Sequence, residues 1–94
     1  NNIAIGTALL VRVTGPAGNF ALTGFAGGYA GRKLFVYNTT ASNMSASNED
    51  ALSLAGNRIL ILSGAPAAVT SGTGIMEFIY SATDSRWLLV GVHG

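Results

Sequence analysis

The chain has 94 residues and a formal net charge of +1; 49% of its residues are hydrophobic and only 10% are charged. A charge this small, without a basic stripe, excludes the electrostatic footprint of a nucleic-acid-binding protein. The absence of cysteine excludes disulfides, thiolate metal sites and cysteine nucleophiles. No apolar run approaches the ~20 residues of a membrane-spanning helix, so we also expect no membrane insertion.

The first half of the chain consists of short apolar and β-branched runs separated by turn residues, which is the pattern of β-strands. The turn signal Gly15-Pro16 ends the first run, and a glycine-rich loop from Gly24 to Gly31 separates the second run from the third. The strands predicted here are 9–14, 20–23 and 33–37, with a further short strand around Met44.

The second half continues this pattern, with strands predicted at 58–62, 69–70, 75–80 and 86–92. The last two flank the loop 81–85 and predict a hairpin. The best helix candidate is the short segment 48–55, where Asn48 would cap about two turns at most. Regularly spaced strands predict an all-β fold, a small antiparallel β-sandwich or jelly-roll-like domain, with residues 1–94 as a single domain.

Several predicted strands are apolar on both faces. Along 58–62, Ile59 and Ile61 face one way while Leu60 and Leu62 face the other. A strand with one solvated face should alternate between apolar and polar residues, and one small domain cannot bury so much apolar surface. We therefore expect that copies of the chain cover one another in a homo-oligomer.

No residue pattern predicts catalysis, a cofactor or a metal site, and we expect a non-enzymatic protein. His93, the single histidine, has no predicted nucleophile or acid partner. The carboxylates do not form a glycosidase-like pair, because Glu49 and Asp50 are adjacent, Glu77 lies in an apolar strand and Asp84 lies in a turn. The glycine-rich loop lacks phosphate-binding motifs, so we expect its glycines to provide positive φ angles.

Arg58 stands at the head of an apolar strand in a chain with few charges. Such a cation is expected to have a partner, and we predict an ion pair with Glu49 or Asp50 that fixes the connection between them.

Phe25, Tyr29 and Arg32 lie in or beside the glycine-rich loop. Exposed aromatic rings can stack on sugar faces while an arginine hydrogen-bonds sugar hydroxyls, which makes these residues candidates for receptor contact. The alternative is that the aromatic side chains fold back as loop anchors or subunit contacts.

The order of several short motifs resembles the C-terminal or head modules of bacteriophage tail fibres and other receptor-binding virion proteins. The matching parts are a glycine-rich loop leading to Gly31-Arg32-Lys33-Leu34, a strand ending in Asn38, Glu49-Asp50, Asn57-Arg58-Ile59, and a final hairpin with Tyr80 and Arg86-Trp87-Leu88. In this family the strand after Arg58 tends to be more polar, whereas Ile59 to Leu62 are entirely apolar here.

The resemblance implies a mostly β, trimeric module that is a fragment of a longer extracellular fibre or spike protein on the virion. It implies attachment to a host cell-surface receptor, either a glycan or a protein; the alternative is a trimerisation or assembly module without receptor contact. It implies no catalytic residues. The residues expected to form the scaffold are Gly31, Asn38, Glu49, Arg58, Tyr80 and Trp87, with Tyr80 and Trp87 packed across the last hairpin.

Overall fold

The computed structural model describes residues 2–94 and has the predicted all-β fold. Its elements are short strands joined by turns, with one single-turn 3-10 helix. In chain order they are β1 (Ile3–Ala4), β2 (Leu10–Val13), β3 (Phe20–Leu22), β4 (Phe25–Ala26), β5 (Lys33–Asn38), β6 (Met44–Ser47), η1 (Ala55–Asn57), β7 (Ile59–Leu60), β8 (Ala67–Thr70), β9 (Gly74–Ser81) and β10 (Arg86–His93).

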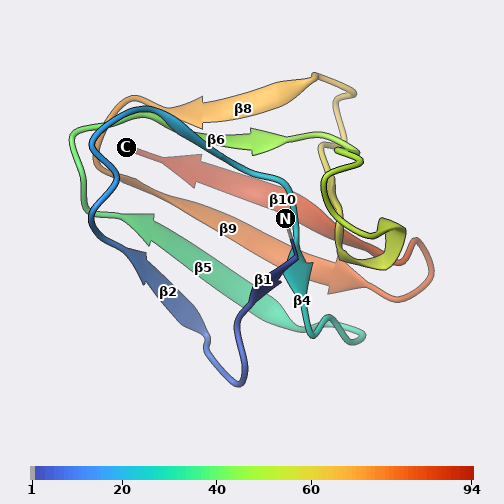
Figure 1. Ribbon diagram of the computed structural model, residues 1–94. Coiled ribbons are helices and arrows are strands. Elements are labelled where there is room, and N and C mark those ends of the chain that lie inside the picture. The colour runs from blue at the N-terminus through green and yellow to red at the C-terminus, as the bar shows by residue number, and fades with distance from the viewer. Residues whose placement is uncertain (1) are drawn as a thin grey trace.

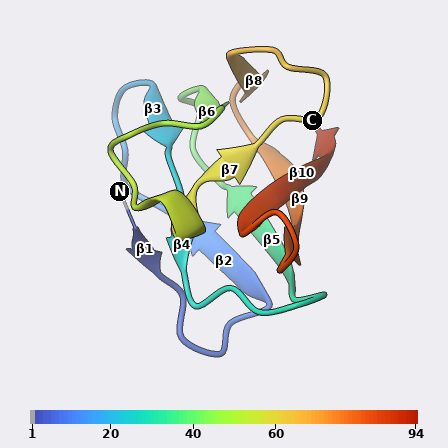
Figure 2. The ribbon, with the colours of Figure 1, turned by 90° about the vertical axis from the view of Figure 1, so that its right-hand side faces the viewer.

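The strands form two sheets and a short ribbon (Figure 1). One sheet has five strands in the order β2-β5-β9-β10-β7, the other has three in the order β3-β6-β8, and β1 pairs with β4. Figure 2 shows β3, β6 and β8 lying over one face of the five-stranded sheet. The domain is therefore sandwich-like, with the opposite face of the larger sheet left without a covering layer in the described part of the chain.

The sheets are mixed, which corrects the prediction of an antiparallel sandwich. The pairs β1–β4, β2–β5, β3–β6 and β7–β10 are parallel, whereas β5–β9, β6–β8 and β9–β10 are antiparallel. The parallel pairs arise because the chain crosses between layers: β3 follows β2 in sequence but lies in the other sheet, and β5 then returns beside β2. Parallel neighbours require such a crossover, whereas a tight hairpin makes antiparallel ones.

The core lies between the two sheets and follows the two-residue period of the strands. On β5, Leu34 and Val36 are buried while Phe35 between them is half-buried; on β9, Met76 and Phe78 are buried in the same way. Alternation therefore assigns one side of the five-stranded sheet to the core and the other side to the outside of the domain.

An aromatic cluster fills the centre of the core. The fully buried Trp87 contacts Phe25 and Tyr80 edge-on, with ring centroids 5.6 and 5.3 Å apart. The Trp87 Nε1–H donates to the carbonyl of Phe25 at 2.9 Å, and the Tyr80 hydroxyl donates to the carbonyl of Gly56 at 2.9 Å. The cluster thus buries large rings while their polar atoms remain hydrogen-bonded.

Two expectations for the middle of the chain are corrected. No α-helix forms over 48–55; the segment ends in the 3-10 turn η1. The strand predicted over 58–62 is reduced to β7, because the Asn48 side-chain oxygen accepts the Ile61 N–H at 2.7 Å and the Ile61 carbonyl accepts the Gly64 N–H at 2.9 Å. These local hydrogen bonds turn the chain away from the sheet after Leu60.

Candidate functional site

The uncovered side of the five-stranded sheet, here called the outer face, is mainly apolar. Its cross-strand neighbours follow from the register: Ile79 lies beside Lys33 and Leu88, and Leu88 lies beside Leu60 on β7. A second row runs Leu10–Phe35–Glu77, and a third runs Arg12–Tyr37–Ile75–His93. An apolar face rimmed by charges is the usual character of an interaction surface.

Glu77 and His93 form a polar pair on the outer face, in addition to the charged side chains of Arg12 and Lys33. Their side chains are 3.4 Å apart, from Nε2 to Oε1. Both pass over Gly91, where an added Cβ would lie 3.0 Å from Glu77 Oε2 and 3.1 Å from His93 Nε2. The absence of a side chain at residue 91 therefore leaves the room in which this pair sits.

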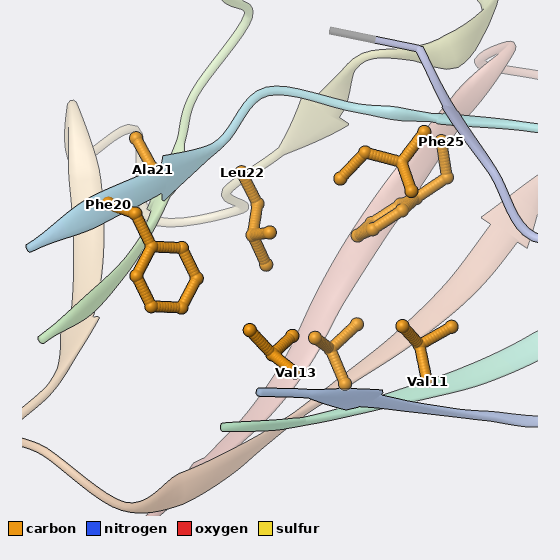
Figure 3. Close-up of a pocket in the computed structure, with 8 residues that line it drawn as sticks. Val11, Val13, Phe20, Ala21, Leu22 and Phe25 are labelled. Atoms are coloured by element: carbon orange, nitrogen blue, oxygen red, sulfur yellow. The ribbon is translucent and has the colours of Figure 1, made fainter. Parts of the chain in front are cut away.

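A second apolar feature, the inter-sheet cleft, opens between β2 and β3 (Figure 3). It has a volume of about 320 Å³ and is lined by hydrocarbon side chains alone, among them Val11, Val13, Phe20, Ala21, Leu22 and Phe25. Figure 3 shows Val11 and Val13 rising from β2 toward Phe20 and Leu22 of β3. The cleft thus lies between edge strands of the two sheets.

The glycine-rich segment connects β4 to β5 and is fixed by Arg32. The Arg32 side chain donates to the carbonyls of Gly27 and Gly6, both at 2.8 Å, and of Ala8 at 2.9 Å. Arg32 is only 5% exposed. A buried guanidinium with several carbonyl acceptors has its charge stabilised by oriented dipoles and can join segments that are distant in sequence.

These contacts correct two of the three residues proposed for receptor contact. Phe25 is fully buried in the aromatic cluster. The buried Arg32 side chain donates its hydrogen bonds to backbone carbonyls. Tyr29 remains available for receptor contact, because it is 62% exposed. The centre of its ring lies 5.5 Å from the Arg32 guanidinium carbon. Burial could not be read from the segment because glycine-rich loops and packed connections have the same composition.

Gly31 and Asn38 hold the two ends of β5. Gly31 has φ +78°, in the left-handed region that favours glycine, and its N–H donates to the carbonyl of Tyr80 at 3.0 Å. The buried Asn38 amide donates to the carbonyls of Ser42 at 2.8 Å and Gly72 at 3.0 Å. Both residues fix connections and neither contributes to an exposed site.

The predicted ion pair of Arg58 is corrected as well. Glu49 pairs with Arg86 on β10, through Arg86 Nε and through a second contact of 3.3 Å from Nη2. β7 and β10 are parallel, and Ile59 lies beside Trp87. Arg58 and Arg86, which precede these two residues, therefore lie at the same level of neighbouring strands. Glu49 pairs with Arg86 and not with Arg58. Arg58 Nε instead donates to the carbonyl of Ser53 at 3.1 Å.

Hydrogen bonds shift the pKa values of two charged groups near this connection. The bond to Glu49 raises the pKa of Arg86 above its ordinary value. The hydrogen bond from the backbone N–H of Leu52, with help from the Ser47 side chain, lowers the pKa of the exposed Asp50 carboxyl. Each bond favours the charged form of its group, which is the form that a structural contact uses.

In residues 2–94, no group of three or more histidine, aspartate or glutamate side chains is placed to hold a metal ion, and no helix is long and apolar enough to cross a membrane. The two apolar surfaces are therefore the strongest candidate sites. Comparison with known protein families, curated proteins and solved structures finds no match to this chain.

Proposed function

We propose that this chain is a non-enzymatic assembly module of a bacteriophage tail fibre or spike, in which three copies cover one another's outer faces. The observation that carries the proposal is the apolar outer face of the five-stranded sheet, which the described part of the chain leaves uncovered. The resemblance of the motif order to fibre modules supports the trimer and the virion location.

Association of copies would cover this apolar face and remove it from water. Ile79, Leu88 and Leu60 form a continuous apolar row across three neighbouring strands. Removing apolar surface from water contributes about 25 cal/mol for each Å², and a 94-residue domain has little stability to spare without such a contribution. Closed symmetric oligomers are the common solution.

The test is the mass of the protein in solution, measured by size-exclusion chromatography with light scattering. The expected mass is three times the 9.6 kDa of one chain. Ile79→Lys places a charge in the apolar row on β9, the central strand of the sheet, and should give a monomer. Val69→Lys is the matched control, because Val69 is an exposed valine on β8 of the other sheet and should leave the trimer intact. A wild-type monomer at high concentration would refute the proposal.

Attachment to a host receptor is the second candidate function, and the exposed Tyr29 is the observation that favours it. The Arg32 side chain beneath the loop contacts Tyr29 and holds three backbone carbonyls, so the ring is presented from a fixed connection. Fixed aromatic rings are suited to stacking on sugars. A glycan array with the labelled protein tests this: binding that Tyr29→Ala abolishes supports attachment, whereas a tight trimer without glycan binding supports assembly alone.

A further inference from the structure

The inter-sheet cleft is bordered on both sides by strand edges. β2 is the last strand of the five-stranded sheet and β3 is the last strand of the three-stranded sheet. An edge strand presents a row of N–H and C=O groups without a strand partner, and this row can receive another strand.

The backbone hydrogen bonds of β3 show which of its N–H and C=O groups point toward the open side. The Phe20 N–H donates to the carbonyl of Asn43 at 3.0 Å, toward β6. In a parallel ladder the neighbouring residue then directs its N–H and C=O to the opposite side. Ala21, which also lines the cleft, therefore directs its backbone groups to the free edge.

The backbone groups of β2 alternate in the same way between β5 and the open side. The carbonyls of Leu9 and Val13 accept the N–H groups of Phe35 at 2.9 Å and Thr39 at 3.1 Å, on the side of β5. The backbone groups of Leu10 and Arg12 consequently point away from β5. The cleft thus combines an apolar floor with backbone donors and acceptors along its rims.

We infer that the inter-sheet cleft binds an extended peptide segment with apolar side chains at alternate positions, which adds to the free edge of β3 as a fourth strand. Main-chain hydrogen bonds to Ala21 would hold the segment, and its apolar side chains would cover Val11 and Val13. Strand addition combines these two kinds of contact, backbone pairing for affinity and alternate side-chain pockets for specificity.

The size and chemistry of the cleft favour this occupant over others. The hollow of about 320 Å³ is a local feature that takes a few side chains of one segment, whereas a contact between globular copies needs a broad surface that buries roughly 1,200–2,000 Å². Water requires two to four polar partners, and the apolar side chains that form the floor of the cleft offer none, so water can hydrogen-bond only at its rims. A small hydrocarbon would fill the floor but leave both edges unpaired. The inference does not depend on the proposed trimer, because β2 and β3 lie at an edge of the sandwich and not at the centre of the outer face.

The test uses a capped hexapeptide of alternating valine and threonine, titrated into the intact protein and followed by amide and methyl NMR. The peptide should shift the Val11 and Val13 methyl signals and slow hydrogen exchange at the Ala21 amide. The matched peptide with N-methylated valines keeps the side chains but lacks half of the backbone N–H donors. Its affinity should be lower by a factor of at least about ten.

A variant provides the second arm. Ala21→Pro removes the N–H that faces the cleft, and proline is tolerated on the free side of an edge strand; it should abolish peptide binding while far-UV circular dichroism stays unchanged. Equal binding of both peptides, no binding at about 1 mM peptide, or displacement of the peptide by 1-octanol would each overturn the inference. Peptide-independent dimerisation through the Ala21 edge would also overturn it. The peptide comparison stands by itself if the variant does not fold.

Discussion

Arg32 shows how one buried charge can organise a connection. Its guanidinium joins Gly27, which follows β4, to Gly6 and Ala8, which precede β2. It therefore holds the glycine-rich segment against the N-terminal turn, in a domain that has neither a disulfide nor a long helix there. Its neighbour in sequence, Lys33, is exposed at the start of β5.

We predict that Arg32→Ala lowers the free energy of unfolding by about 3 kcal/mol, because three part-buried hydrogen bonds from a charged donor to backbone carbonyls are lost. Urea denaturation followed by circular dichroism measures this change. Lys33→Ala is the matched control, since it removes a cation from an exposed position beside Arg32 and should cost less than about 0.5 kcal/mol. Equal effects of the two variants would contradict the structural role of Arg32.

Asp50 gives the fold an acid-sensitive contact. Its pKa is lowered from the ordinary value of 3.8 chiefly by the Leu52 backbone N–H. A depressed pKa contributes stability above the unfolded-state value, and this contribution disappears as the pH falls through the lower folded-state value. Asp50→Asn should therefore reduce Tm at pH 7, and the difference from wild type should shrink as the pH falls below the ordinary value of 3.8 and through the lowered folded-state pKa. Thermal melts across that range check the prediction; a constant difference would contradict it.

At the scale of elements, close approach decides several connections. Gly28 packs directly under the Tyr80 ring, where an added Cβ would lie 2.2 Å from Tyr80 Cδ1. Tyr80 also contacts Trp87 edge-on and donates a hydrogen bond to the carbonyl of Gly56. The connection from β4 to β5 and the end of β9 are thus packed against each other without room for a side chain.

Gly28→Ala should cost about 2 kcal/mol, because the extra methyl group forces the Tyr80 ring to shift in a packed region. Gly18→Ala is the matched control: nothing lies within 4 Å of its added Cβ, and its φ is outside the left-handed region. Differential scanning calorimetry of both variants measures the effect as a drop in Tm. A comparable drop for Gly18→Ala would show that backbone flexibility, and not the ring, causes the loss.

At the scale of the whole molecule, two surfaces of different kind serve different contacts. The outer face is broad and lies on one side of the five-stranded sheet, whereas the inter-sheet cleft is small and lies at its β2 edge. A broad apolar face suits another globular copy, and a narrow cleft between strand edges suits an extended segment.

Association through the outer face predicts that thermal stability depends on concentration. Because only the folded chain associates, mass action raises Tm as protein concentration increases. The expected result is a rise of several degrees across a hundredfold concentration range for wild type, and a constant Tm for Ile79→Lys. A wild-type Tm that does not change with concentration would argue against the outer face as an interface.

The positions of most strands could be predicted from the sequence, because alternation and turn residues act locally. The predicted 33–37, 75–80 and 86–92 correspond to β5, β9 and β10, and the hairpin joining the last two is confirmed. β1 and β4 were missed because two residues give no periodic signal. The excess of apolar residues indicated uncovered surface but not its location.

The all-β character of this protein was set by the sequence itself, through short apolar runs whose spacing leaves no room for helices. Only the tertiary structure decided that four pairs are parallel, that Glu49 meets Arg86, and that Phe25 and Arg32 are buried. The physical reason is that strand pairing, ion pairing and burial depend on which distant segments come together, whereas backbone preference depends on neighbours in the chain.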